Sequence, residues 1–236
     1  MSAYAHPVVM IPGMMCDHRL FDPQVQVLGD SHSIITATIP MSSSIEAMAE
    51  SLLEALPDCF ALLGLSMGGI IAMEMWRQAP EKIERLALLD TNHRADTPER
   101  RSLRDRQIED VKRGELWTVM REELKPNYLA SIHQGNTALL DHVLNMGMEQ
   151  GEDAFVAQSL ALRDRPDSQS TLPSITCPTL VLCGDEDRLC TPETHRQIAD
   201  AIPGADLRVI TDCGHLATLE QPEPVNTALR EWLQAA

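Results

Sequence analysis

Ser66 lies in a glycine-rich stretch, residues 64–69 (GLSMGG), whose residue types and spacing suit nucleophilic chemistry. An apolar run of strand length, residues 59–63, precedes this stretch, and residues 70–76 have the length and composition of a helix. A sharp turn from strand to helix raises a serine hydroxyl clear of the backbone, where a substrate can reach it. The stretch therefore predicts a nucleophile elbow with Ser66 as the nucleophile.

Glycines stand two residues before and two residues after Ser66. In a turn this tight the side chains at those positions would collide, and Gly64 and Gly68 remove the collision. The alternative is a glycine-rich turn with an incidental serine. A chance match to this pattern in a chain of 236 residues has a probability of roughly a few per cent. The strand before and the helix after make coincidence rarer still, so the pattern favours a catalytic serine.

A serine hydroxyl is a poor nucleophile at neutral pH and needs an adjacent base. His215 lies in residues 213–216 (CGHL), directly after the last predicted strand, and such a loop reaches the carboxyl end of a parallel sheet. The elbow is expected at the same end. The other histidines fit less well, because they lie before the first strand, in early loops, in the middle of the chain or on a helix: His6, His18, His32, His93, His133, His142 and His195.

An acidic residue is needed to hold the imidazole in the tautomer that accepts the serine proton. The predicted strand 179–183 is followed by Asp185, Glu186 and Asp187. Asp187 is the predicted acid, because a residue beyond the strand-ending turn can reach the histidine loop, whereas Asp185 and Glu186 are typical of solvated turns. Asp90, which follows the predicted strand 86–89, is the main alternative.

Acyl transfer also needs hydrogen-bond donors directed at the oxyanion. The backbone N–H of Met67, directly after the nucleophile, is one expected donor. The second is expected from the loop after the first strand, where Gly13 permits a sharp turn that directs the Met14 N–H inward. The alternative for this loop is a plain turn at the end of a strand.

Apolar runs of strand length alternate with segments of helical period, which predicts a mostly parallel, doubly wound α/β sheet covered by helices on both faces. Helices are expected over residues 44–56, with a capping box from Ser43 and Glu46, after Thr97-Pro98 and Thr191-Pro192, and over 222–233. The predicted strands are residues 7–11, 33–39, 59–63, 86–89, 179–183 and 207–210.

Residues 92–173 contain no strand-like run and show only helical patterns. We interpret them as a helical cap insertion between two parts of one α/β core, residues 1–91 and 174–236. Two apolar stripes are expected in the insertion: Leu103, Ile108, Val111, Leu116, Val119 and Met120, and then Leu139, Leu140, Val143, Leu144 and Met148.

The formal net charge of −16 argues against nucleic acid or an anionic membrane as a partner and leaves a small-molecule substrate. No apolar stretch is long enough for a membrane span, and the N-terminus does not resemble a signal peptide. The six cysteines form no C-x-x-C pair, and Cys59 and Cys183 are expected as small core residues. These features predict a reduced, cytoplasmic protein. Its oligomeric state is open, a homodimer included.

In the order Ser, Asp, His, these motifs resemble the α/β-hydrolase superfamily, in the branch that includes small carboxylesterases, enol-lactone hydrolases and carbon–carbon bond hydrolases. The similarity covers residues 1–91 and 174–236, and the middle of the chain matches nothing recognisable. Pro12 departs from the family pattern, which often has histidine there. The matching segments are the oxyanion turn Pro12-Gly13, the elbow 64–69, the acid loop 184–187 with 191–192, and the histidine loop 213–215 with Glu220 and Pro222.

The resemblance implies an acyl-enzyme on Ser66, hydrolysed by water that His215 activates, with no cofactor and no metal. Serine at the elbow speaks against the dehalogenase and epoxide-hydrolase branches. The leading hypothesis is hydrolysis of a small carboxylic ester or lactone. Carbon–carbon bond hydrolysis and a ligand-binding receptor of the same fold are the alternatives.

Substrate-binding residues are harder to assign from sequence. Methionines near the expected site, namely Met14, Met15, Met67 and those in 146–148, suit either an apolar pocket or the core. Arg188 suits either a substrate carboxylate or exposure to solvent. The arginines in 94–113 alternate with acidic residues at i,i+4 spacing, which indicates a solvated helix face rather than an anion site.

Overall fold

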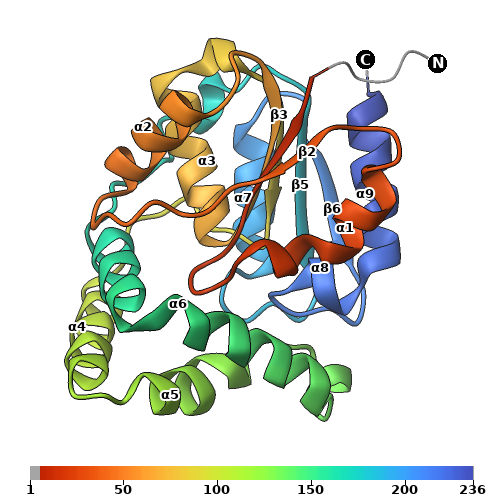
Figure 1. Ribbon diagram of the computed structural model, residues 1–236. Helices are drawn as coiled ribbons and strands as arrows, with labels where there is room; N and C mark the ends of the chain where they lie inside the picture. Colours follow the sequence, from red (N-terminus) through yellow and green to blue (C-terminus); the bar gives the residue numbers. More distant parts are fainter. Residues whose placement is uncertain (1–5, 236) are drawn as a thin grey trace.

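A computed structural model describes residues 6–235, which form a six-stranded parallel sheet with helices on both faces (Figure 1). The strand order is β2-β1-β3-β4-β5-β6, so the chain reverses direction across the sheet after β2. The strands are β1 (Val8–Ile11), β2 (Ile34–Thr36), β3 (Phe60–Leu65), β4 (Ile83–Leu89), β5 (Thr179–Gly184) and β6 (Asp206–Ile210). The predicted fold class is confirmed.

The inner strands β1, β3 and β5 are apolar on both sides, because each face of the sheet is covered. In β1 the side chains of Val9 and Ile11 enter one core cluster, and those of Val8 and Met10 enter the other. This alternation is the two-residue period of an extended strand. β4 begins at Ile83, earlier than the predicted Leu86, because Glu84 and Arg85 hid the start of the apolar run.

Helices α2 (Ile45–Ala55), α3 (Met67–Gln78) and α7 (Pro192–Ala201) cover one face, and α1 (Asp22–Leu28) and α9 (Pro222–Gln234) cover the other (Figure 1). The short helix α8 (Ala217–Glu220) directly precedes α9. Side chains such as Met48 and Met73 fill the first interface, and Leu229 and Trp232 fill the second. Burying a side chain of this size contributes about 1.5–3 kcal/mol, so both helix layers hold the sheet firmly.

The helix caps agree with the sequence at two of three places. Thr97 and Thr191 each accept a hydrogen bond from a backbone N–H three residues on, with proline at the first helical position. At α2 the predicted cap, Ser43, is wrong by one residue. Ser44 accepts from the Ala47 N–H and donates to Glu46 at 2.7 Å. The consecutive serines in this segment made the register ambiguous in sequence.

Between β4 and β5 the described chain forms helical elements without a strand. They are α4 (Pro98–Lys112), α5 (Leu116–Thr118), the π-helical turn η3 (Val119–Leu124), the 3-10 turns η4 (Lys125–Asn127), η5 (Ser131–His133) and η6 (Leu172–Ser174), and the long helix α6 (Thr137–Asp164). In Figure 1 α4, α5 and α6 lie together beyond one end of the sheet. Leu103 and Met148 of the predicted stripes are exposed, and Met146 is buried instead.

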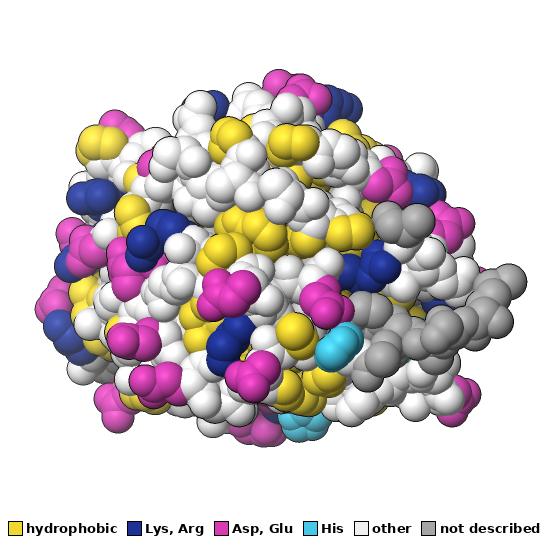
Figure 2. Space-filling view, turned by 90° about the horizontal axis from the view of Figure 1, so that it is seen from above, with side chains coloured by type: hydrophobic (Ala, Val, Ile, Leu, Met, Phe, Trp, Pro, Cys, Tyr) yellow, Lys and Arg dark blue, Asp and Glu magenta, His cyan; other side chains and the backbone are white. Residues whose placement is uncertain are grey.

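On the face drawn in Figure 2, charge is spread rather than concentrated. In this view from above, acidic and basic side chains alternate around a central hydrophobic area. Cys183 is buried as expected, but Cys59 is only half-buried, because it lies just before β3 begins. None of the helices in residues 6–235 is long and apolar enough to span a membrane.

Candidate active site

Ser66 lies between β3 and α3 with a backbone conformation of φ 55° and ψ −114°. Positive φ is costly for a residue other than glycine, and such strain is retained mostly at functional sites. A Cβ on Gly64 would lie 2.2 Å from the Gly68 carbonyl oxygen, and one on Gly68 would lie 2.1 Å from the Ile11 oxygen. The glycines therefore let the turn close and let α3 approach β1, which raises the Ser66 hydroxyl at the carboxyl end of the sheet.

His215 lies in the loop after β6, and its Nε2 is 2.9 Å from Ser66 Oγ. The backbone of the loop is held in place on both sides of the ring. The His215 N–H donates to the Tyr128 carbonyl at 2.7 Å, and the Glu220 carboxylate accepts from the Gly214 N–H at 2.9 Å. Sequence reasoning did not identify Tyr128, which comes from the helical segment before α6.

Asp187 follows β5, and its Oδ2 lies 2.8 Å from His215 Nδ1. Its other oxygen accepts from the backbone N–H groups of Leu189 and Cys190 at 2.8 and 2.9 Å. Burial acts to raise the pKa of Asp187, but the His215 ring and the two N–H donors outweigh burial and hold that pKa below its usual value. A carboxylate that stays ionised keeps the proton of the neutral imidazole on Nδ1 and leaves Nε2 to accept from Ser66.

Asp90, the alternative acid, makes no contact with His215 among the hydrogen bonds of the described residues. Its two oxygens accept from the Gly184 N–H at 3.2 Å and the Ala217 N–H at 3.0 Å. Burial first, and then the nearby Asp187 carboxylate, raise the pKa of Asp90 well above its ordinary value. Asp90 thus ties together the loops after β5 and β6, which carry Asp187 and His215.

Met14 and Met67, the residues predicted to supply the oxyanion donors, line the same cavity as Ser66. Met67 is the first residue of α3, and the first N–H groups of a helix have no partner inside the helix. The loop after β1 supplies Met14, and an added Cβ on Gly13 would lie 3.3 Å from Ser66 Cβ. The next residue, Met15, has φ 56°, and its N–H donates to the buried Gln158 Oε1 at 2.8 Å. Gln158, which sequence reasoning missed, therefore holds the loop that presents Met14.

Thr91 and His195 form a second set of buried contacts that holds the backbone of the elbow. Thr91 Oγ1 donates to the Ser66 carbonyl at 2.7 Å, and the Thr91 N–H donates to His195 Nε2 at 2.9 Å. His195 Nδ1 lies 3.1 Å from the Thr191 carbonyl oxygen, which can only accept a hydrogen bond. Because Nε2 accepts and Nδ1 donates, the ring is neutral with its proton on Nδ1. Burial lowers the pKa of His195 to about 4.

This histidine predicts a pH-dependent loss of stability. Because its pKa falls from about 6.5 in the unfolded chain to about 4 in the fold, the unfolded state binds the extra proton between these values. Stability is fully present above about pH 6.5 and falls as pH drops toward 4, by about 2 kcal/mol at pH 5. Urea unfolding at pH 7 and pH 5 measures the loss.

His195→Gln keeps an acceptor for Thr91 but removes the titration, so its free energy of unfolding should fall about 2 kcal/mol less between pH 7 and pH 5. His18→Gln is the matched control, since the His18 side chain is 66% exposed. Equal pH dependence in the wild type and His195→Gln would contradict this account.

Comparison with known proteins shows the family to which this chain belongs. The family described as "Alpha/beta hydrolase family" matches residues 8–228. The chain belongs to the alpha/beta hydrolase family. It is an enzyme, a hydrolase, with the parallel sheet, covering helices and turn geometry described above.

Relatives of this hydrolase match it over nearly its whole length. A putative carbamate hydrolase RutD of Yersinia enterocolitica is 27% identical and covers 98% of this chain and 88% of its own. The (E)-2-((N-methylformamido)methylene)succinate hydrolase of Acinetobacter baylyi is 25% identical, covering 97% and 90%. A thermophilic esterase from Thermogutta terrifontis, solved with malate bound, superposes with a TM-score of 0.91 at 32% identity, covering 98% and 90%.

A cavity of about 210 Å³ opens over Ser66 and His215 in this hydrolase. Met14 and Met67 line it, as the pocket interpretation of the methionines predicts. Met15 and Met146 instead lie in the core. The Arg188 side chain is 48% exposed and faces Glu186 outside the cavity, which agrees with the solvent-exposed alternative.

The interpretation of residues 94–113 as a solvated face is wrong for part of helix α4. Arg106 and Asp110 do form the expected i,i+4 pair at 2.9 Å. Arg100 and Arg104, however, line the cavity together with Arg165 from the end of the helical segment. The Arg104 side chain is only 15% exposed, because it reaches the buried Asp96. Periodicity alone could not show which side of α4 faces the site.

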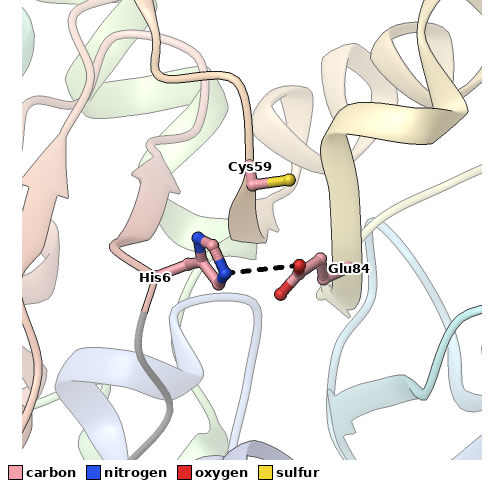
Figure 3. A group of neighbouring side chains, drawn as sticks. All are labelled: His6, Cys59 and Glu84. Atoms are coloured by element: carbon pink, nitrogen blue, oxygen red, sulfur yellow. Dashed lines mark ion pairs between the residues drawn. The ribbon is translucent and has the colours of Figure 1, made fainter.

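Two groups of three potential metal ligands occur within residues 6–235. Asp187, Cys190 and His215 form one, in which Asp187 and His215 already bond to each other. In the other, His6 and Cys59, which lie just before β1 and β3, and Glu84 of β4 point toward one another (Figure 3), with His6 Nε2 at 3.5 Å from Glu84 Oε1. Sequence spacing did not reveal this group.

Imidazole nitrogen, thiolate and carboxylate are all zinc ligands, but the group of His6, Cys59 and Glu84 lies at the amino end of the sheet. β3, which separates Cys59 from Ser66, has a length of roughly 20 Å. A metal ion there would not touch the reacting atoms at the carboxyl end.

Proposed function

We propose that this chain is a serine hydrolase that cleaves a small carboxylic ester or lactone through an acyl-enzyme on Ser66. The observation that carries the proposal is the continuous hydrogen-bonded chain from Ser66 Oγ through His215 to Asp187, at 2.9 and 2.8 Å. A nucleophile in contact with a base, and a base oriented by a buried carboxylate, are the parts that acyl transfer needs.

In the first half of the reaction His215 Nε2 takes the Ser66 proton while Oγ bonds to the substrate carbonyl carbon. The N–H groups of Met14 and Met67 stabilise the oxyanion. The tetrahedral intermediate then expels the alcohol oxygen, which receives the proton from His215. Water repeats the sequence on the acyl-enzyme, and its proton passes through His215 back to Ser66, so one ester and one water give an acid and an alcohol.

The relatives support this class of chemistry. The Thermogutta protein is an esterase, and the Acinetobacter and Yersinia proteins are named as hydrolases of an N-acyl enamine and of a carbamate. In each of these bonds a carbonyl carbon is joined to oxygen or nitrogen, and Ser66, His215 and the proposed oxyanion donors of this chain suit attack on such a carbon. An ester or lactone is the simplest member of the set.

The proposal is tested by covalent capture and by turnover on the same preparation. A fluorophosphonate should label the wild-type protein at a stoichiometry near one, and peptide mapping should place the label on Ser66. An ester panel of increasing acyl length should then show turnover that the label abolishes. Absence of both labelling and ester turnover would refute the proposal and leave carbon–carbon bond hydrolysis or ligand binding.

A further inference from the structure

The wall of the active-site cavity is basic in a chain that is acidic overall. Arg100, Arg104 and Arg165 line the cavity beside Ser66, whereas Glu123 is the single acidic side chain lining it among residues 6–235. Glu123 is already neutralised by Arg106, at 2.6 Å. Because the formal net charge of the chain is −16, these arginines do not simply reflect composition.

One buried carboxylate, that of Asp96, forms ion pairs with two of the three guanidinium groups. Asp96 has a fully buried side chain, with Oδ2 at 2.5 Å from Arg104 Nε and Oδ1 at 2.8 Å from Arg165 Nη1. Within residues 6–235, Arg100 forms no ion pair with an acidic side chain. The cluster of Asp96, Arg100, Arg104 and Arg165 therefore carries a surplus of about two positive charges. A surplus charge next to a partly closed cavity is costly unless an anion balances it.

Arg104 is oriented as a binding group. Its Nε is fixed by Asp96, and of its terminal nitrogens Nη1 contacts Met14 Sδ at 3.9 Å. That contact places the guanidinium beside the loop expected to hold the oxyanion. Arg100 precedes Arg104 by four residues in α4, so both side chains lie on one face of the helix.

Arg165 has a different role from the other two arginines. It donates to the Arg94 carbonyl at 3.0 Å and to the Leu162 carbonyl at 2.8 Å, in addition to its pair with Asp96. Its side chain is 4% exposed. Arg165 thus holds Asp96 in position, and Arg104 and Arg100 remain to meet a ligand.

We propose that the substrate carries a carboxylate in addition to the bond that is cleaved, and that Arg104 and Arg100 bind it. This inference rests on the proposed function and names its substrate class. A guanidinium fork is complementary to a carboxylate, and such charge-assisted pairs are about twice as strong as neutral hydrogen bonds. The cavity of about 210 Å³ lies below the usual range for ligand pockets, which selects a small molecule such as the half-ester of a short dicarboxylic acid.

Binding to the Ser66→Ala protein tests the inference without any need for turnover. The ligands are the monomethyl esters of malonic, succinic, glutaric and adipic acids, each paired with the uncharged amide of the same length. We expect at least one half-ester to bind about tenfold or more tightly than its amide in titration calorimetry. The preference should weaken as sodium chloride is added.

Variants then locate the preference. Adding Arg100→Gln to Ser66→Ala should reduce the ratio of half-ester to amide affinity at least fivefold, and Arg100→Lys should retain part of that ratio because it keeps the charge. Arg113→Gln is the matched control, since Arg113 follows the same helix, is 68% exposed and does not line the cavity. It should preserve the ratio.

Equal affinity for every half-ester and its amide would overturn the inference, as would an equal loss for both ligands in Arg100→Gln. Tighter binding of inorganic phosphate than of any half-ester would overturn the assignment to a carboxylate. These outcomes are separate from failure of the proposed function. If the half-esters bind but the wild type neither hydrolyses an ester nor takes up the fluorophosphonate, the anion site stands and the serine mechanism falls.

Discussion

Ser66→Ala should lower kcat for the best ester of the panel by about 10⁴–10⁶-fold, with little change in the stability of the fold. Alanine removes the oxygen that bonds to the substrate carbonyl carbon, and loss of a nucleophile from a serine–histidine pair has effects of this size. His215 and the oxyanion donors remain, so substrate binding should persist. Fluorophosphonate labelling should be lost as well, because the same oxygen takes up the label. Steady-state turnover measures the loss of kcat, and labelling measures the loss of the nucleophile.

Ser102→Ala is the control for the serine substitution, because Ser102 lies exposed on α4 and its hydroxyl donates to the Pro98 carbonyl. It should retain full turnover and labelling. Ser66→Ala activity within about a hundredfold of wild type, or labelling that persists in it, would show that another residue is the nucleophile.

Asp187→Asn should lower kcat by about 10³–10⁴-fold with a small effect on KM, through a change of tautomer. The Leu189 and Cys190 N–H groups both donate to Asp187 Oδ1, so the asparagine carbonyl must stay on that side. Its NH₂ group then faces His215 Nδ1 and donates to it. The imidazole proton moves to Nε2, where it faces Ser66 and can no longer accept the serine proton.

Asp185→Asn is the matched control, since Asp185 lies in the same loop and its side chain accepts a bond from the Cys213 N–H at 3.2 Å. One amide oxygen can keep that bond, so activity should stay near wild type. Asp90→Asn tests the alternative acid. If it were inactive while Asp187→Asn kept more than a tenth of wild-type activity, Asp90 would be the acid.

The elbow and the order of its partners were open to prediction because local sterics dictate them. A turn that lets Gly64 contact the Gly68 carbonyl admits no side chain at either position, and this requirement shows directly in the sequence. The loops that carry Asp187 and His215 follow strands of a parallel sheet, so their arrival at one end follows from topology. The cap at Ser44 was missed by one residue because neighbouring serines offer equivalent oxygens.

Other features of the site depend on contacts between distant residues. Gln158 holds the Met15 N–H from 143 positions away, and His195 meets Thr91 across 104 positions. Glutamine on a helix and histidine on a helix carry no local sign of such roles. The same holds for Tyr128, whose carbonyl fixes the His215 backbone.

The sequence by itself determined the fold class, the turn that carries Ser66 and the two residues expected to act with it, Asp187 and His215, because each depends on backbone sterics or on the ends of strands. Only the tertiary structure decided the character of the cavity. Charges at i,i+4 spacing on α4 predicted a solvated helix, but Asp96 is desolvated and draws Arg104 and the distant Arg165 around it. Burial sets the free energy of a charge, and burial is a property of the packed chain rather than of any local segment.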